Sequence, residues 1–216
     1  WCEATKRLIE SYLRPGCKRL DFNYSLIRPE GALIKGFGGI ASGPAPLRKL
    51  HETIRAFMDR YIVDEKYDSV MLKTDLANLV GCCVVAGNVR RSAEIAVGSI
   101  DDPVFIDLKD YEKHPYRAAL GWMSNNSVIL DKDEDFEKLG EVAERVKKNG
   151  EPGVINLRNF KYGRIGKHSD GLREDRASLC NPCGEITLEN KELCNVVETL
   201  PTRCPNNEIW LRAIDY

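Results

Sequence analysis

The sequence predicts an α/β fold, because stretches with the spacing of amphipathic helices alternate with short apolar strands along its 216 residues. Apolar residues recur every three or four positions in 46–62 and 133–150, which is typical of helices that bury one face. Short apolar runs at 122–130 and 152–157 instead have the length and composition of strands. No internal repeat or low-complexity linker interrupts this alternation, so mixed layers of helix and sheet are expected.

The first expected element is a half-buried strand at 20–25. Leu20, Phe22 and Tyr24 alternate there with polar residues, which is the two-residue period of a strand. A glycine-rich loop, 35–44, follows this strand. Glycines suit a segment whose backbone must take conformations that other residues avoid.

Two helices and then further strands are expected after the loop. The helix at 46–62 leads to a second helix at 74–87, with Asp75 near its start and Gly87 closing it. The remaining elements, in order, are a strand (90–99), an irregular to helical stretch (101–120), a strand (122–130), a helix ending at Gly150 (133–150), a short strand (152–157), a polar exposed connection (161–177) and a strand (185–188).

The composition is that of an ordinary globular protein, with 43% hydrophobic residues, 30% charged residues and a formal charge of −1. This balance makes no electrostatic case for binding nucleic acid or a membrane surface. No apolar run approaches the roughly 20 residues of a membrane-spanning helix, and we expect no signal peptide. Eight cysteines are too few for a disulfide scaffold, so reduced thiols in the cytoplasm are expected.

The glycine-rich loop fits the pattern G-x-G-x-x-G/A between a strand and a helix. Its residues are Lys35, Gly36, Phe37, Gly38, Gly39, Ile40, Ala41, Ser42 and Gly43. Such a loop can hold a pyrophosphate through backbone amides and the helix N-terminus. However, a second parallel strand ending in an acid is missing, and Asp64 comes late for that role. A plain flexible loop, a phosphate contact and the dinucleotide site of a dehydrogenase all remain open.

The stretch 178–198 gathers three cysteines and several carboxylates around turn-forming residues. A structural zinc site is one interpretation, with the ligands Cys180, Cys183, Cys194 and Cys204. Its weakness is that the second pair of cysteines is ten residues apart, whereas zinc ligands commonly come as close pairs. A thioredoxin-like CxxC is another interpretation, but that motif begins a helix and the residues here indicate a turn. Buried or incidental cysteines are a third.

A fourth interpretation uses all the polar groups of this stretch. Cys183 lies on a tight turn, and Glu185, two residues on, points to the same side of an extended chain, where it can take a substrate proton. Asn181 adds an amide, and Cys194 could supply electrons by forming a disulfide. Because acyl transfer by cysteine would require a histidine nearby, the set favours redox chemistry on a polyol.

Five segments in order give the chain a resemblance to a known family. They are "GFGGIASGP", "GNVRRSAEIAVGS", "SNNSV", "NGEPGVINL" and the stretch from Asn181 to Glu185. From about Leu20 to Cys194 the sequence resembles the monomeric adenosylcobalamin-dependent (class II) ribonucleoside-triphosphate reductases. The resemblance implies part of the ten-stranded α/β barrel of the ribonucleotide reductase and glycyl-radical superfamily, with 178–198 as its finger loop and following strand. Because the family's enzymes are several times longer and the chain starts at Trp1, we expect an internal fragment of the barrel domain, 1–216, that is inactive alone.

The resemblance also implies roles for single residues. Cys183 matches the finger-loop cysteine whose thiyl radical removes the 3′ hydrogen of the substrate. Glu185 matches the carboxylate that takes the proton of the 3′ hydroxyl, and Asn181 matches the amide that binds the ribose hydroxyls. Cys194 matches one half of the redox-active disulfide, whose partner lies upstream of Trp1 in the family. No metal ligand is implied.

The implied ligands and partners are those of the family. They are adenosylcobalamin, whose site lies mostly outside this chain, a ribonucleoside triphosphate, a deoxynucleoside triphosphate effector and a thioredoxin-like reductant, acting on a monomer. The loop 35–44 matches the specificity loop between effector and substrate. One departure is Cys180, where the family carries another residue and where a second exposed thiol could divert Cys183 into a disulfide. Cys82 and Cys83 are interpreted as packing residues. A reductase of another class with the same barrel is the nearest alternative.

Overall fold

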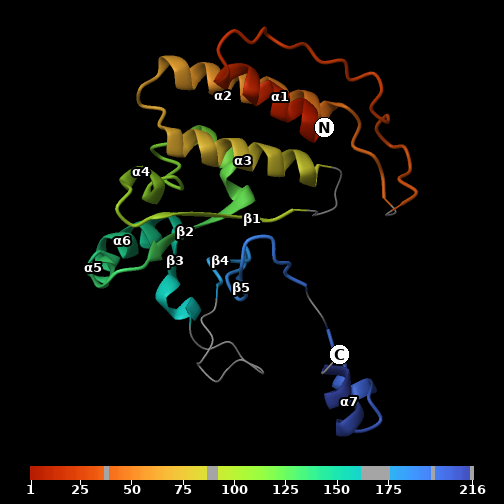
Figure 1. Cartoon of the computed structure of the whole chain (residues 1–216), viewed down its shortest axis with the longest axis vertical. Coiled ribbons are helices and arrows are strands. Elements are labelled where there is room, and N and C mark those ends of the chain that lie inside the picture. The colour runs from red at the N-terminus through yellow and green to blue at the C-terminus, as the bar shows by residue number, and fades with distance from the viewer. Residues whose placement is uncertain (37–38, 87–91, 162–175, 196–197, 215–216) are drawn as a thin grey trace.

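The computed structural model describes residues 1–36, 39–86, 92–161, 176–195 and 198–214. Its elements are α1 (Cys2–Leu13), α2 (Ala45–Val63), α3 (Ser69–Val85), β1 (Glu94–Ser99), α4 (Pro103–Ile106), η1 (Pro115–Ala119), η2 (Gly121–Met123), β2 (Ser124–Leu130), α5 (Asp133–Glu137), α6 (Leu139–Asn149), β3 (Gly153–Asn156), η3 (Leu157–Lys161), β4 (Leu179–Cys180), β5 (Thr187–Leu188), η4 (Pro201–Arg203) and α7 (Asn207–Ile214). Figure 1 shows α1 and α2 outermost, α3 beneath them, and the sheet β1–β3 on the far side of α3.

The sheet β1-β2-β3 is parallel throughout, which confirms the α/β class. Val128 and Leu130 of β2 are buried in the core, and β2 pairs with both neighbours. Parallel neighbours require crossover connections, and α5 and α6 provide the one between β2 and β3. The strands expected at 122–130 and 152–157 are therefore present with slightly narrower bounds, while the ten-stranded barrel stays a prediction.

Helix α2 confirms the periodicity seen at 46–62. Leu47, Leu50, Ile54 and Met58 are buried along one face, with Ile54 fully excluded from solvent. Helix α2 contacts α3, and buried residues of both helices belong to the hydrophobic core. Helix α3 therefore lies between α2 on one side and the sheet on the other (Figure 1).

The start predicted for the second helix is wrong. Helix α3 begins at Ser69, where the Asp68 side chain caps it by accepting a hydrogen bond of 2.6 Å from the Val70 amide. Asp75 therefore lies inside the helix, fully buried, rather than in its first turn. The predicted end at Gly87 falls outside the described residues.

The strand predicted at 20–25 is also wrong. These residues belong to neither sheet, yet their alternation is real, because Phe22 and Tyr24 turn toward α2 while their neighbours face solvent. The Tyr24 hydroxyl is 2.8 Å from Nδ1 of His51, and the Phe22 ring centroid is 4.5 Å from the His51 ring. Thr5 of α1 contacts the other ring nitrogen at 3.1 Å. The extended segment thus packs its alternate side chains on a helix instead of pairing with a strand.

Two further helical features differ from expectation. Helix α1 was not predicted, although it buries Leu8 completely, because Trp1 provides no side-chain cap that would indicate a helix start. The helix predicted at 133–150 is divided at Lys138 into α5 and α6. Its end is confirmed, since Gly150 takes the left-handed conformation, with φ of 79°, that glycine favours after a helix.

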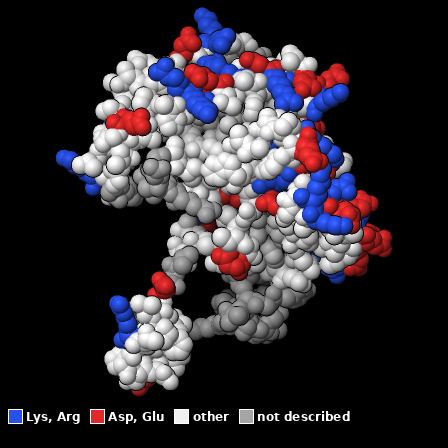
Figure 2. Space-filling model, turned by 180° about the vertical axis from the view of Figure 1, so that it is seen from behind, with Lys and Arg blue, Asp and Glu red and all other residues white. Residues whose placement is uncertain are grey.

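The remaining predicted segments are found in part. The stretch 101–120 contains α4 and η1, as an irregular to helical segment should, and the strand at 185–188 is reduced to β5. Most of the connection at 161–177 falls outside the described residues. None of the helices in the described part of the chain is both long and apolar enough to cross a bilayer. On the face seen in Figure 2, basic and acidic side chains are interspersed mainly over the upper and right-hand parts.

Candidate functional site

The stretch from Ser178 to Leu188 forms a small hairpin. β4 and β5 are antiparallel, with Cys180 opposite Thr187, and the Asn181 amide donates to the Ile186 carbonyl at 3.0 Å. At the turn, the Gly184 amide donates to the Asn181 carbonyl at 2.9 Å, and Gly184 has a φ of 87°, which glycine adopts without strain. These bonds place Cys183 at the tip of the hairpin. The expected turn is thus present, and the CxxC does not begin a helix.

Asn181 holds the hairpin together through its side chain. It is 3% exposed, and its Oδ1 accepts a hydrogen bond of 3.0 Å from the Ile186 amide. Its Nδ2 donates to the Cys194 sulfur at 3.3 Å. The structure therefore brings together two of the predicted site residues, Asn181 and Cys194, that are separated by 13 positions in the sequence.

The two cysteines of the CxxC have different environments. Cys180 is 5% exposed, whereas Cys183 is exposed, and both are free thiols. Burial, and secondarily the negative charge of Glu185, raise the pKa of the Cys180 thiol. Glu185 itself is exposed beside the tip. A disulfide between Cys180 and Cys183 would require both thiols to be accessible. Because the Cys180 thiol is buried and protonated, formation of that disulfide is not favoured.

We expect iodoacetamide to modify Cys183 at least about tenfold faster than Cys180 in the native protein, because alkylation requires an accessible thiolate. Timed alkylation followed by peptide mass spectrometry measures both rates in one sample. Unfolding the protein in urea should remove the difference. Equal rates in the native protein would contradict the burial of Cys180.

A cavity of about 570 Å³ opens beside the hairpin. Its walls include Asn125 and Ser127 of β2, Glu151 before β3, and Pro182 and Cys183 of the hairpin. In Figure 1 this hairpin lies on the side of the sheet opposite α3. The exposed thiol therefore borders a space that is lined by amide, hydroxyl and carboxylate groups and is large enough for a small polar molecule.

The glycine-rich loop folds back on itself. Leu33 and Ile40 form an isolated antiparallel bridge, and the Ala41 amide donates to the Ala32 carbonyl at 2.8 Å. Phe37 and Gly38 lie outside the described residues. Because no strand in the described part of the chain precedes the loop, the strand–loop–helix geometry of a dinucleotide site is absent there, and that alternative is not supported.

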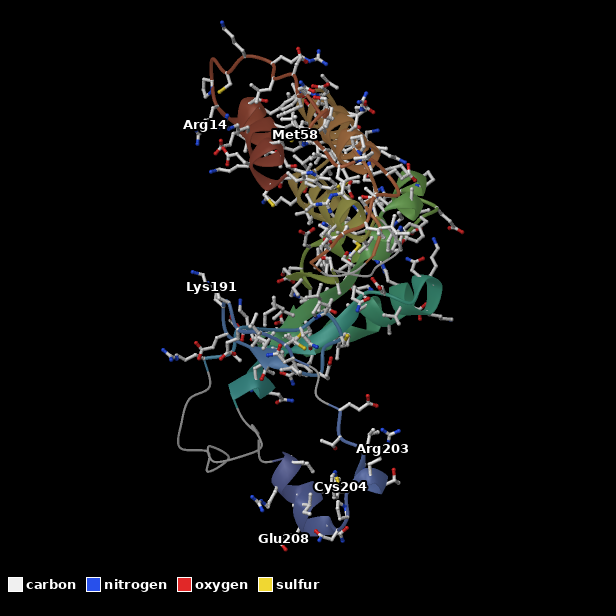
Figure 3. All side chains as sticks on the ribbon, turned by 90° about the vertical axis from the view of Figure 1, so that its right-hand side faces the viewer. Arg14, Met58, Lys191, Arg203, Cys204 and Glu208 are labelled. Carbon is white, nitrogen blue, oxygen red and sulfur yellow. The ribbon has the colours of Figure 1, made fainter. Side chains whose placement is uncertain are left out.

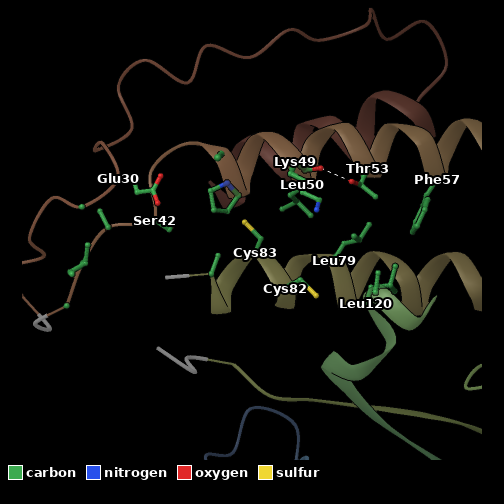
Figure 4. A pocket seen from close by; sticks show the side chains of 18 of the residues that line it. Glu30, Ser42, Lys49, Leu50, Thr53, Phe57, Leu79, Cys82, Cys83 and Leu120 are labelled. Atoms are coloured by element: carbon green, nitrogen blue, oxygen red, sulfur yellow. Dashed lines mark hydrogen bonds between the residues drawn. The ribbon is translucent and has the colours of Figure 1, made fainter. Parts of the chain in front are cut away.

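A second cavity, of about 1070 Å³, lies between this loop and the helices α2 and α3. Figure 4 shows Ser42, Lys49 and Thr53 on one side of it, with Cys82 and Cys83 on the other. Cys83 is buried and Cys82 is half-buried, and burial raises the pKa of both thiols. Their position in the wall between two helices agrees with packing residues.

The zinc interpretation fails in the described residues. Among them no group of three or more histidine, cysteine or acidic side chains is arranged to hold a metal ion. Cys204 lies near α7, in the part of the chain far from the hairpin, as Figure 3 shows. Its sulfur contacts the Leu200 carbonyl at 3.7 Å. The four cysteines therefore do not converge.

Comparison with known proteins gives the site a family context. Residues 1–58 match the family model of the insertion domain of B12-dependent ribonucleotide reductases. This match covers α1 and most of α2. It includes residues 1–19, which precede the part of the sequence in which the family motifs were found.

Three relatives are similar over nearly the whole chain. A probable adenosylcobalamin-dependent ribonucleoside-triphosphate reductase of Dictyostelium discoideum is 43% identical over 100% of the chain and 28% of its own length. The reductases of that name from Euglena gracilis and Lacticaseibacillus paracasei are 43% and 38% identical, over 99% and 93% of the chain and 28% and 27% of their lengths. No solved structure matches. The resemblance to adenosylcobalamin-dependent ribonucleotide reductases that the motifs predicted is confirmed, and the chain spans under a third of these relatives.

Proposed function

We propose that the protein to which this chain belongs reduces ribonucleoside triphosphates to 2′-deoxyribonucleoside triphosphates for DNA synthesis. The observation that carries the proposal is the hairpin, which presents the Cys183 thiol at a cavity whose wall includes amide, hydroxyl and carboxylate groups and holds Asn181 against Cys194. The names of the relatives give the same reaction. In this proposal the hairpin is the finger loop of the enzyme. The three parallel strands β1–β3 form part of its barrel.

Cys183, Glu185 and Cys194 each have one task in the proposed reaction. The Cys183 thiyl takes the 3′ hydrogen atom of the ribose. Glu185 takes the proton of the 3′ hydroxyl and passes it to the 2′ hydroxyl, which leaves as water. Cys194 and a second thiol then supply two electrons and two protons and become a disulfide. Cys183 returns its hydrogen atom to the 3′ carbon. A thioredoxin-like dithiol reduces the disulfide for the next turnover.

Asn181 has a structural task in addition to the proposed contact with ribose. Its amide is already engaged by the Ile186 amide and by the Cys194 sulfur. We infer that this hydrogen bond sets the orientation of the Cys194 side chain relative to the hairpin.

The described residues fit adenosylcobalamin at one point, the free and exposed thiol of Cys183, and most of the cofactor site is expected elsewhere. When bound, adenosylcobalamin would supply the radical that removes the hydrogen atom from the Cys183 thiol. The loop 35–44 is proposed as the specificity loop, since it borders the larger cavity and lies before α2, where a deoxynucleoside triphosphate effector would bias its conformation.

The proposal is tested by assaying deoxynucleotide formation with the full-length product of the gene that encodes this sequence. With a ribonucleoside triphosphate and a dithiol, product should form only when adenosylcobalamin is added. Product without the cobalamin would assign the chain to another reductase class with the same barrel. No product under either condition would overturn the proposed reaction. The isolated 216-residue chain should be inactive in the same assay.

A further inference from the structure

A hydrogen bond joins the hairpin to the parallel sheet through Asn125 of β2. Its Nδ2 donates to the Pro182 carbonyl at 2.7 Å, across 57 positions of sequence. Because a carbonyl can only accept, its partner must be the NH₂ group of the amide. Asn125 is exposed and lines the same cavity as Cys183.

This bond acts on the peptide unit that carries the reactive cysteine. The Pro182 carbonyl belongs to the peptide bond whose nitrogen is that of Cys183, so the orientation of this plane sets the direction of the Cys183 side chain. The carbonyl of Asn181 is bound within the turn by the Gly184 amide. The Pro182 carbonyl is instead bound from outside the hairpin, by Asn125.

The donor is held by a rigid support. Asn125 pairs with Ile95 of β1, and the amide of the next residue, Asn126, donates to the Glu151 carboxylate at 3.0 Å. Strand β2 is the central strand of its sheet, whereas the hairpin has only two paired positions of its own. A two-stranded hairpin of this size is not stable alone, so its tip needs an external anchor.

We propose that Asn125 is a positioning residue that fixes the Cys183 thiol at the cavity through the Pro182 carbonyl. The expected effect on catalysis rests on the proposed function. The contact between Asn125 and the hairpin can be tested separately, by a measurement that does not depend on enzyme activity. Loss of the donor should lower kcat by roughly 10- to 100-fold, since a displacement of about 1 Å at the reacting atom has an effect of that size. KM should stay unchanged, because the Asn125 amide donates to the Pro182 carbonyl rather than to a substrate.

The test uses two variants in the full-length gene product. Asn125→Asp keeps the shape of the side chain but presents an acceptor to the carbonyl, and Asn125→Ala removes the group. Asn23→Asp is the matched control, because Asn23 is exposed and its Oδ1 accepts from the Ser25 amide at 2.9 Å, a bond that aspartate keeps. Initial rates give kcat and KM. Hydrogen exchange of the peptides covering 178–188 and of α2 and α3 is measured on the same samples.

The expected result is a lower kcat with an unchanged KM in both Asn125 variants, and faster exchange in 178–188 alone. Unchanged exchange in that segment would overturn the inference whether or not the protein is active. A normal kcat in both variants, when Cys183→Ser is inactive, would overturn it while leaving the proposed function intact. Exchange that also rises in α2 and α3 would show general unfolding and reject a positioning role.

Discussion

Replacing Cys183 with serine is expected to abolish deoxynucleotide formation by the full-length protein, with a loss of about 10⁴-fold or more. A serine hydroxyl has nearly the shape of the thiol, but its O–H bond is too strong to yield a radical under the same conditions. The exposed position of Cys183 at the tip of the hairpin makes a packing effect small. The loss should therefore appear as a lack of product, measured by chromatography of the nucleotides, without a change in thermal stability.

Cys180 supplies a matched control for this result. It lies three positions earlier in the same hairpin, carries the same thiol and is buried. Cys180→Ser should retain most of the activity, with a modest loss of stability because a hydroxyl is placed in a site that now holds a thiol. Activity that survives Cys183→Ser, or that is lost equally in both variants, would contradict the assignment of the radical to Cys183.

Replacing Arg117 with methionine is expected to lower the local free energy of unfolding by about 3–5 kcal/mol, the usual cost of leaving one member of a buried ion pair alone. Arg117 and Asp75 are both fully buried and form an ion pair between η1 and α3. The Asp75 carboxylate also accepts hydrogen bonds from Tyr67 at 2.7 Å and Tyr116 at 3.0 Å. Hydrogen exchange of the α3 amides in the full-length protein measures the change.

The pH dependence of this loss identifies its cause. Burial raises the pKa of Asp75 even with Arg117 present, and without the guanidinium the carboxyl group should protonate more readily still. Since protonation removes the uncompensated charge, the cost of Arg117→Met should be smaller near about pH 4.5 than near about pH 7. The double variant Asp75→Asn with Arg117→Met should be more stable than Arg117→Met alone. A pH-independent loss would point to packing instead.

Local sequence patterns predicted much of the scaffold. Two patterns predicted which residues are buried: the apolar stripe from Leu47 to Met58 and the apolar run of β2. The structure buries these residues as expected. The same reasoning missed the start of α3 at Ser69 and the break at Lys138. Helix boundaries depend on single capping contacts, which add little to a periodic pattern.

The extended segment around Phe22 and Tyr24 shows what a local pattern cannot predict, which is the element that a segment packs against. Alternation at 20–25 correctly indicated a segment buried on one side, but it does not specify whether a strand or a helix covers that side. His51 of α2 decided the outcome, and it lies more than 25 positions away. The buried pair of Asp75 and Arg117 was missed for the same reason, since its members are 42 positions apart.

By itself the sequence determined the α/β class, the main helices and the residues that the hairpin offers for chemistry, because each depends on neighbours in the chain. Only the tertiary structure decided which thiol of the CxxC is buried, how Asn181 meets Cys194, and that Asn125 reaches the Pro182 carbonyl. The physical reason is that burial and hydrogen bonding depend on groups brought together by packing, and two cysteines three positions apart differ in accessibility solely through what lies over them.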